Sequence, residues 1–133
     1  MTLAPFVAAP ALIQFHAGAA LFALLAGCAV MLGRKGTRAH RRTGWVFATA
    51  MAAVALSSLF ITRNGSYSAI HLLTALTLVA LPSGLLAARH GRIRKHRSAM
   101  ISLFVGLAVA GAFTLLPGRL MHQIAYSLPA AAR

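Results

Sequence analysis

The sequence predicts an all-α fold, an integral membrane four-helix bundle with up-down topology, from three features. The 133-residue chain is 59% hydrophobic with a mean hydropathy of +0.79, which is too apolar for a soluble protein of this length. Four apolar stretches, at about 11–33, 43–62, 67–88 and 98–117, carry no Lys or Arg. Each is close to the roughly 20 residues that a helix needs to cross a ~30 Å hydrocarbon core. The third feature is a histidine pattern that occurs in both halves. At this length, residues 1–133 are expected to form a single four-span domain.

This histidine repeat predicts two tandem helical hairpins of the same plan. His16 precedes His40 by 24 residues, and His71 precedes His96 by 25. Each interval contains an apolar stretch followed by a basic loop, and a second apolar stretch follows. The four histidines are therefore expected at matching heights in the two hairpins.

Turn and capping residues separate the helices. Gly36 lies in the turn after the first stretch, and Thr37 is suited to cap the second helix, which places His40 in its first turn. Gly91 is expected to end the third helix, and the fourth helix is expected to begin before His96.

The distribution of basic residues predicts the orientation in the membrane. Ten lie in the first and third loops, against three on the opposite side. Loops rich in Lys and Arg stay in the cytoplasm, so a multi-pass protein of the bacterial inner membrane is expected, with both termini outside and a short amphipathic outer tail at 119–133. The net charge of +13 then predicts anionic inner-leaflet lipid as a partner, and no nucleic acid, because the basic loops are short and lie at the membrane. The ten basic residues of the first and third loops are Arg34, Lys35, Arg38, Arg41, Arg42, Arg89, Arg92, Arg94, Lys95 and Arg97. The three on the opposite side are Arg63, Arg119 and Arg133.

The chain contains no Asp or Glu. Their absence excludes carboxylate proton relays, carboxylate sites for calcium or magnesium, and a Ser-His-Asp triad. A histidine that needs a hydrogen-bond acceptor must use a hydroxyl, an amide or a backbone carbonyl.

The four repeated histidines are the candidate metal ligands. Short loops place the first helix diagonal to the third and the second diagonal to the fourth. His16 would then face His71 near the outer boundary, and His40 would face His96 near the inner boundary. Two neutral imidazoles on facing helices can hold a b-type haem, whereas tetrahedral zinc fits less well because the four ligands divide into two layers.

Haem would also account for two of the arginines. Its propionates are anions, and Arg41 and Arg97 directly follow the inner histidines, so both are candidate cofactor-binding residues. One or two haems b are expected, and the outer site is favoured over the inner one.

Each layer has an alternative interpretation. The outer pair would be buried histidines bonded to a neighbouring helix, through Gln14 or Thr74. The inner pair would bind lipid head groups or a quinone at the membrane surface. His90 has no partner in the repeat and is expected to be solvated.

These residues resemble a bacterial family of predicted four-helix membrane proteins that has no established activity. The resemblance covers roughly Ile13 to Pro117, and family members often have an aromatic residue where this chain has Ala99. The arrangement is also similar to the transmembrane two-haem cytochromes b, a resemblance that implies first-with-third and second-with-fourth ligand pairs. That class has its inner ligands deeper within the helices. The family motifs are His16-Ala17-Gly18, His40-Arg41-Arg42-Thr43-Gly44, His71, and His96-Arg97 with Met100.

The leading hypothesis is a small b-type haem-binding membrane protein that transfers electrons within or across the bacterial inner membrane. His16 and His71 would ligate an outer haem, and the inner pair a second haem or a quinone. The alternative is a non-catalytic accessory subunit of a larger membrane complex that binds lipid and partner helices without a cofactor. A partner membrane subunit or a homo-oligomer is expected under either hypothesis. A transporter is less favoured because the spans contain no acidic residue.

Overall fold

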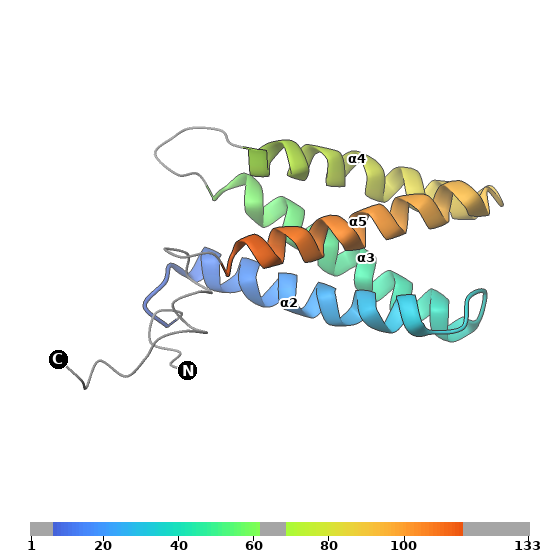
Figure 1. Cartoon of the computed structure of the whole chain (residues 1–133), viewed down its shortest axis with the longest axis horizontal. Coiled ribbons are helices and arrows are strands. Elements are labelled where there is room, and N and C mark those ends of the chain that lie inside the picture. Colours follow the sequence, from blue (N-terminus) through green and yellow to red (C-terminus); the bar gives the residue numbers. More distant parts are fainter. Residues whose placement is uncertain (1–6, 62–68, 116–133) are drawn as a thin grey trace.

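The computed structural model describes residues 7–61 and 69–115, and within these ranges it contains helices and no strand. Successive long helices run in opposite directions (Figure 1). This confirms the all-α, up-down bundle. The helices are α2 (Ala11–Leu32), α3 (Arg38–Leu59), α4 (Ala69–Arg89) and α5 (Ile93–Phe113).

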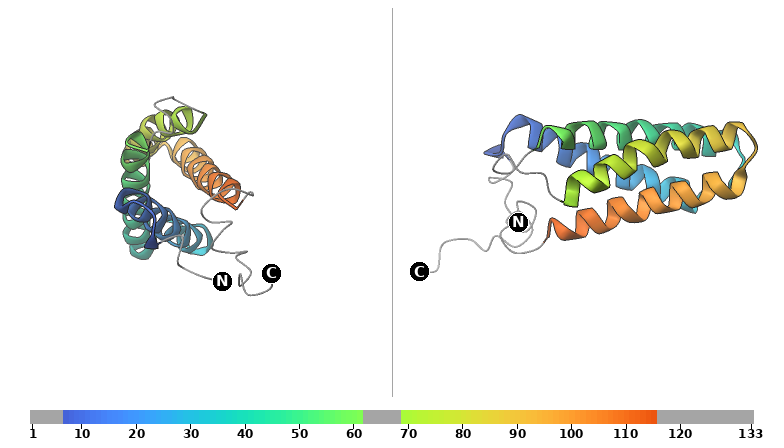
Figure 2. Two further views of the ribbon diagram at one scale, coloured as in Figure 1. Left: turned by 90° about the vertical axis from the view of Figure 1, so that its left-hand side faces the viewer. Right: turned by 90° about the horizontal axis from the view of Figure 1, so that it is seen from above.

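The helices follow one another around the bundle in chain order (Figure 2). The closest packing is of α2 against α3 and of α4 against α5, the two hairpins that the repeat predicts. The hairpins join through α3 and α4, and α2 touches α5 at far fewer places. Hence α2 lies diagonal to α4, and α3 lies diagonal to α5.

Two helices begin before their predicted apolar stretches. The first turns of α3 and α5 contain the basic residues that precede positions 43 and 98. As predicted, the Thr37 hydroxyl caps α3 by accepting a hydrogen bond from the His40 amide at 3.0 Å. Gly36 and Gly91 have φ of 78° and 69°, the left-handed region that glycine adopts without strain. The predicted turns are therefore confirmed.

Three of the helices are long and apolar enough to cross a membrane, namely α2, α5 and the segment His71–Arg89 of α4. The remaining helix, α3, has 22 residues like α2, but it is more polar because it opens with Arg38, Arg41 and Arg42. It packs between α2 and α4.

Large apolar side chains fill the middle of the bundle. Phe47 is only 1% exposed, and Met51, Met100 and Leu103 are buried around it. A Cβ atom at Gly27 would lie 2.5 Å from the ring of Phe104, so this glycine is what allows α5 to approach α2. The two ends of the bundle are thus separated by a packed apolar layer.

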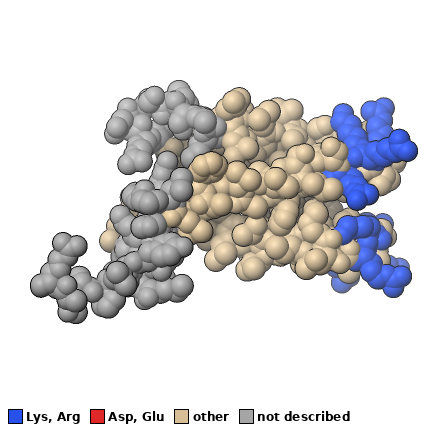
Figure 3. Space-filling view, in the orientation of Figure 1, with Lys and Arg blue, Asp and Glu red and all other residues tan. Residues whose placement is uncertain are grey.

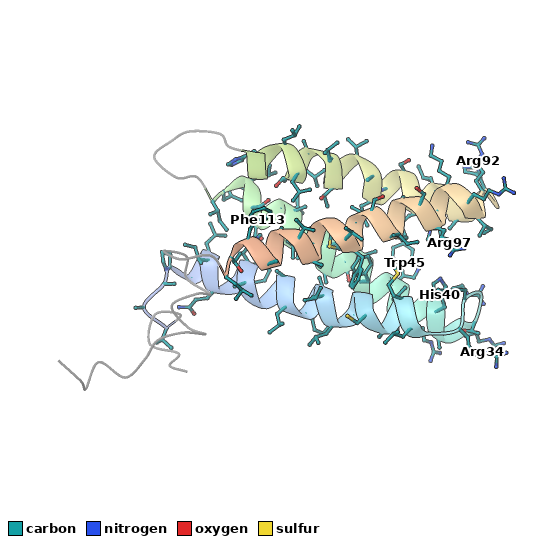
Figure 4. All side chains as sticks on the ribbon, in the orientation of Figure 1. Arg34, His40, Trp45, Arg92, Arg97 and Phe113 are labelled. Atoms are coloured by element: carbon teal, nitrogen blue, oxygen red, sulfur yellow. The ribbon has the colours of Figure 1, made fainter. Side chains whose placement is uncertain are left out.

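All the described Lys and Arg residues belong to the α2–α3 and α4–α5 connections and adjoining turns, at one end of the molecule (Figure 3). We call this the basic end. Lys35 caps α2 there, because its Nζ donates to the carbonyl oxygens of Val30 and Gly33 at 2.8 Å. Trp45 is 51% exposed near the same end (Figure 4), as is common for tryptophan at a membrane interface. The predictions for Arg63 and the tail 119–133 lie outside the described residues.

Candidate functional site

The four candidate histidines occupy two layers at opposite ends of the bundle. His16 is in the second turn of α2 and His71 is in the first turn of α4, and these two helices start at the same end (Figure 1). His40 and His96 are in the first turns of α3 and α5, which start at the basic end (Figures 1 and 4). All four side chains are half-buried.

In the layer predicted to be the outer one, His16 is held by a hydroxyl of the neighbouring helix. Its Nδ1 lies 2.8 Å from the Oγ of Ser57, and the Ser57 hydroxyl donates its single proton to the carbonyl oxygen of Val54 at 3.0 Å. With that proton on the carbonyl oxygen of Val54, the Oγ atom accepts from His16, and Nδ1 is then the protonated nitrogen of the neutral ring. Nε2 is left with a lone pair in the neutral ring, the form in which a histidine binds a metal.

The same layer continues toward α4 through buried hydroxyls. Ser58 and Thr74 are 6% and 5% exposed, and their side-chain oxygens are 2.7 Å apart. Thr74 stands three residues after His71, whose Nε2 atom is buried. We call His16, Ser57, Ser58 and Thr74 the outer polar seam, which links three helices within an otherwise apolar region.

In the inner layer, His96 has a similar arrangement. Its Nδ1 lies 3.0 Å from the backbone carbonyl oxygen of Gly84 on α4. A carbonyl only accepts, so Nδ1 donates and Nε2 of the neutral ring again has a lone pair. A histidine in each layer is thus oriented by a bond to its neighbouring helix.

His40, like His96, lies in a first turn at the basic end. Burial lowers the pKa of His40, and electrostatic interactions with Lys35 and then with His96 lower this pKa further. The Nδ1 atom of His40 is buried without a hydrogen-bond partner in the part of the chain that the structure describes. The surroundings of His40 therefore favour its neutral form.

The two arginines proposed for the propionates, Arg41 and Arg97, are exposed. Arg97 lies at the basic end with His40 (Figure 4). Since the chain has no Asp or Glu, neither arginine has an acidic side chain of its own chain to pair with. His90 is exposed, in agreement with the prediction that it is solvated.

The hydrogen-bond partner of His16 was not predicted from the sequence. The sequence suggested Gln14 or Thr74, but the Nε2 atom of Gln14 donates to the carbonyl oxygens of Val7 and Ala9. The available signal was the pair Ser57-Ser58 inside an apolar stretch. The bond to a neighbouring helix is the one that the alternative interpretation expected, and it leaves Nε2 available to a ligand.

Larger metal clusters are not formed by the described residues, since no three His or Cys side chains converge among them.

Comparison with known proteins identifies one family. A family model described as "Predicted membrane protein (DUF2306)" matches residues 13–130, a range that includes all four histidines. No curated protein and no solved structure matches the chain.

Proposed function

The chain belongs to the DUF2306 family of predicted membrane proteins, and we propose its function from the histidines on its helices. It is a small b-type haem-binding membrane protein that transfers electrons within or across the bacterial inner membrane. One observation carries the proposal. Nδ1 of His16 is hydrogen-bonded to Ser57; with the Ser57 proton on the carbonyl of Val54, Nδ1 is the donor and Nε2 keeps the lone pair, the arrangement typical of a histidine that binds a metal.

The outer site consists of His16 and His71 as axial ligands on diagonal helices. The seam supports both helices, because Ser57 orients His16 while the Ser58–Thr74 bond joins α3 to the first turns of α4. A haem held there would supply one-electron transfer. The protein would supply the ligands, their orientation and an apolar surrounding that excludes water.

The inner site consists of His40 and His96, with Arg41 and Arg97 as partners for propionates. The bond from His96 to Gly84 supports this assignment, as does the low pKa of His40. The packed layer around Phe47 would keep the two sites apart. A quinone is the other occupant that two imidazoles at the membrane surface could bind.

The proposed orientation places the basic end in the cytoplasm and both chain termini outside. The support is the gathering of the described Lys and Arg residues at one end, because cytoplasmic loops retain positive charge. Electrons would pass between a donor on one side, or in the membrane, and an acceptor on the other.

Haem retention in single variants tests the ligand assignment. The full-length protein is expressed with ample haem and purified in detergent, and haem per chain is measured for His16→Ala, His71→Ala and His96→Ala. His90→Ala is the matched control, since His90 is an exposed histidine in the α4–α5 loop. The expected result is loss of the outer haem in the first two variants and full retention in His90→Ala. Far-UV circular dichroism verifies that each variant keeps its helices.

The alternative function, an accessory subunit without a cofactor, is favoured by the outward-facing surface. Only 17–22% of the positions in the three apolar windows are buried within the chain, and many of the others are exposed, where lipid or partner helices could cover them. Wild-type protein that carries no haem under these conditions, or variants that all retain the wild-type spectrum, would contradict the haem assignment. The first of these results would leave the accessory role as the better account.

A further inference from the structure

A hollow on the α4–α5 hairpin combines an apolar wall with a cationic rim. Its volume is about 390 Å³, within the roughly 300–1,000 Å³ that ligand sites occupy. Pro82 and Leu86 of α4 contribute to the wall, whereas His90, Arg92 and Lys95 line the hollow at the basic end. Arg92 extends from the tip of that end (Figure 4).

The charges on this rim are not neutralised by the chain itself. The sequence contains no Asp or Glu, and Arg92 and Lys95 are both exposed. Lys35, at the other connection, instead uses its ammonium group to cap the carbonyls of α2. The counter-ion of the hollow must therefore be an external anion.

The wall indicates what kind of anion this is. Leu86 is 51% exposed on a helix long and apolar enough to cross a membrane. A free phosphate ion would leave this wall uncovered, whereas a phospholipid would cover it with an acyl chain. Another hollow, between α2 and α3, is lined by Gln14, Phe15, Phe22 and small residues and has no Lys or Arg.

We propose that the hollow on the α4–α5 hairpin is a binding site for an anionic phospholipid. The lipid phosphate lies at Arg92 and Lys95, and the first part of an acyl chain follows Pro82 and Leu86 into the membrane. The site is independent of the haem assignment, because it uses none of His16, His40, His71 or His96.

Native mass spectrometry of the full chain in detergent micelles tests the site. The probes are phosphatidylglycerol, phosphatidylcholine with the same acyl chains, and inorganic phosphate. Wild-type protein is expected to retain phosphatidylglycerol in preference to phosphatidylcholine. The double variant Arg92→Gln with Lys95→Gln is expected to weaken that retention about 25-fold, taking roughly fivefold for each basic residue that contacts the lipid phosphate. The matched control, Arg38→Gln with Arg42→Gln, removes the same charge from the other connection and should change retention by less than about twofold.

A third variant tests the apolar wall. Ser83→Trp fills the hollow and leaves every charge in place, because Ser83 lines it beside Pro82. This variant is expected to release phosphatidylglycerol as well. Equal losses in the two charge variants would overturn the proposal by showing a general surface effect. Equal retention of phosphatidylcholine would overturn it too, as would full retention in Ser83→Trp. Displacement of the lipid by millimolar inorganic phosphate would mean that the site takes free phosphate, not lipid.

Discussion

Replacing Gly27 with alanine is expected to destabilise the bundle where α2 meets α5. The added Cβ would lie 2.5 and 2.9 Å from two ring carbons of Phe104, and 3.0 Å from the ring of Phe47. Phe47 is 1% exposed and has no room to withdraw. Overpacking of this kind costs about 1–3 kcal/mol, while alanine in place of glycine within a helix returns up to about 1 kcal/mol.

Gly18 on the same helix provides the matched control. A Cβ at Gly18 would meet no atom within 4 Å, so Gly18→Ala should show only the gain in helix propensity. The two variants are therefore expected to differ in unfolding free energy by about 1–3 kcal/mol. The assay is equilibrium unfolding in mixed micelles with increasing dodecyl sulfate, followed by far-UV circular dichroism.

A second substitution separates the contact from other effects of Gly27→Ala. Adding Phe104→Leu removes the ring that the new methyl group meets, so the double variant should recover part of the loss, with a coupling of about 1 kcal/mol. If Gly27→Ala is as stable as Gly18→Ala, or if no coupling is measured, the close packing of Phe104 of α5 against Gly27 of α2 is contradicted.

Three further predictions concern the ends of the bundle. Ser57→Ala removes the hydrogen-bond acceptor of His16 and should lower haem affinity about 10- to 100-fold, as measured by haem titration. Thr49 is an exposed residue with a hydroxyl on the same helix, and an equal loss of affinity in Thr49→Ala would contradict the role of the outer polar seam. Thr37→Ala removes the cap of α3 and should cost about 1 kcal/mol of unfolding free energy, and an unchanged thermal midpoint would argue against that cap. Because folding lowers the pKa of His40 from 6.5, through burial and then Lys35 and His96, the unfolded chain binds this proton more readily. The folded state is therefore most stable above pH 6.5 with respect to this group, and that stability is lost as the pH falls toward the folded pKa. His40→Gln should flatten the pH dependence of the thermal unfolding midpoint. A wild-type midpoint that rises as the pH falls would refute this role of His40.

The helices and their turns could be predicted because their signals are local. Thr37 caps a helix through its own hydroxyl, and Gly36 and Gly91 adopt left-handed conformations within single turns. The two histidine layers followed from spacing and alternating direction, which four similar helices impose. The starts of α3 and α5 ahead of their apolar stretches were also predicted, from Thr37 and from the position of His96; these first turns carry basic side chains that water can solvate.

The contacts between helices could not be predicted in the same way. His16 and Ser57 are 41 residues apart, and their meeting depends on the rotation of α2 against α3. The hydrogen bonds of Gln14 to its own chain depend on how residues 7–10 fold back at the start of α2. The approach of Phe104 to Gly27 likewise depends on the crossing of non-consecutive helices, and no sequence spacing encodes it.

The absorbance spectrum of the purified wild-type protein tests the central claim most directly. The chain is produced with ample haem and purified in detergent, and the dithionite-reduced minus oxidised difference is recorded with haem quantified per chain. Bis-histidine ligation predicts the sharp α-band of a low-spin b-type haem, with one equivalent if only the outer site is filled and two if both are. A flat difference spectrum from protein that is folded and supplied with haem would contradict the assignment of His16 and His71 as haem ligands.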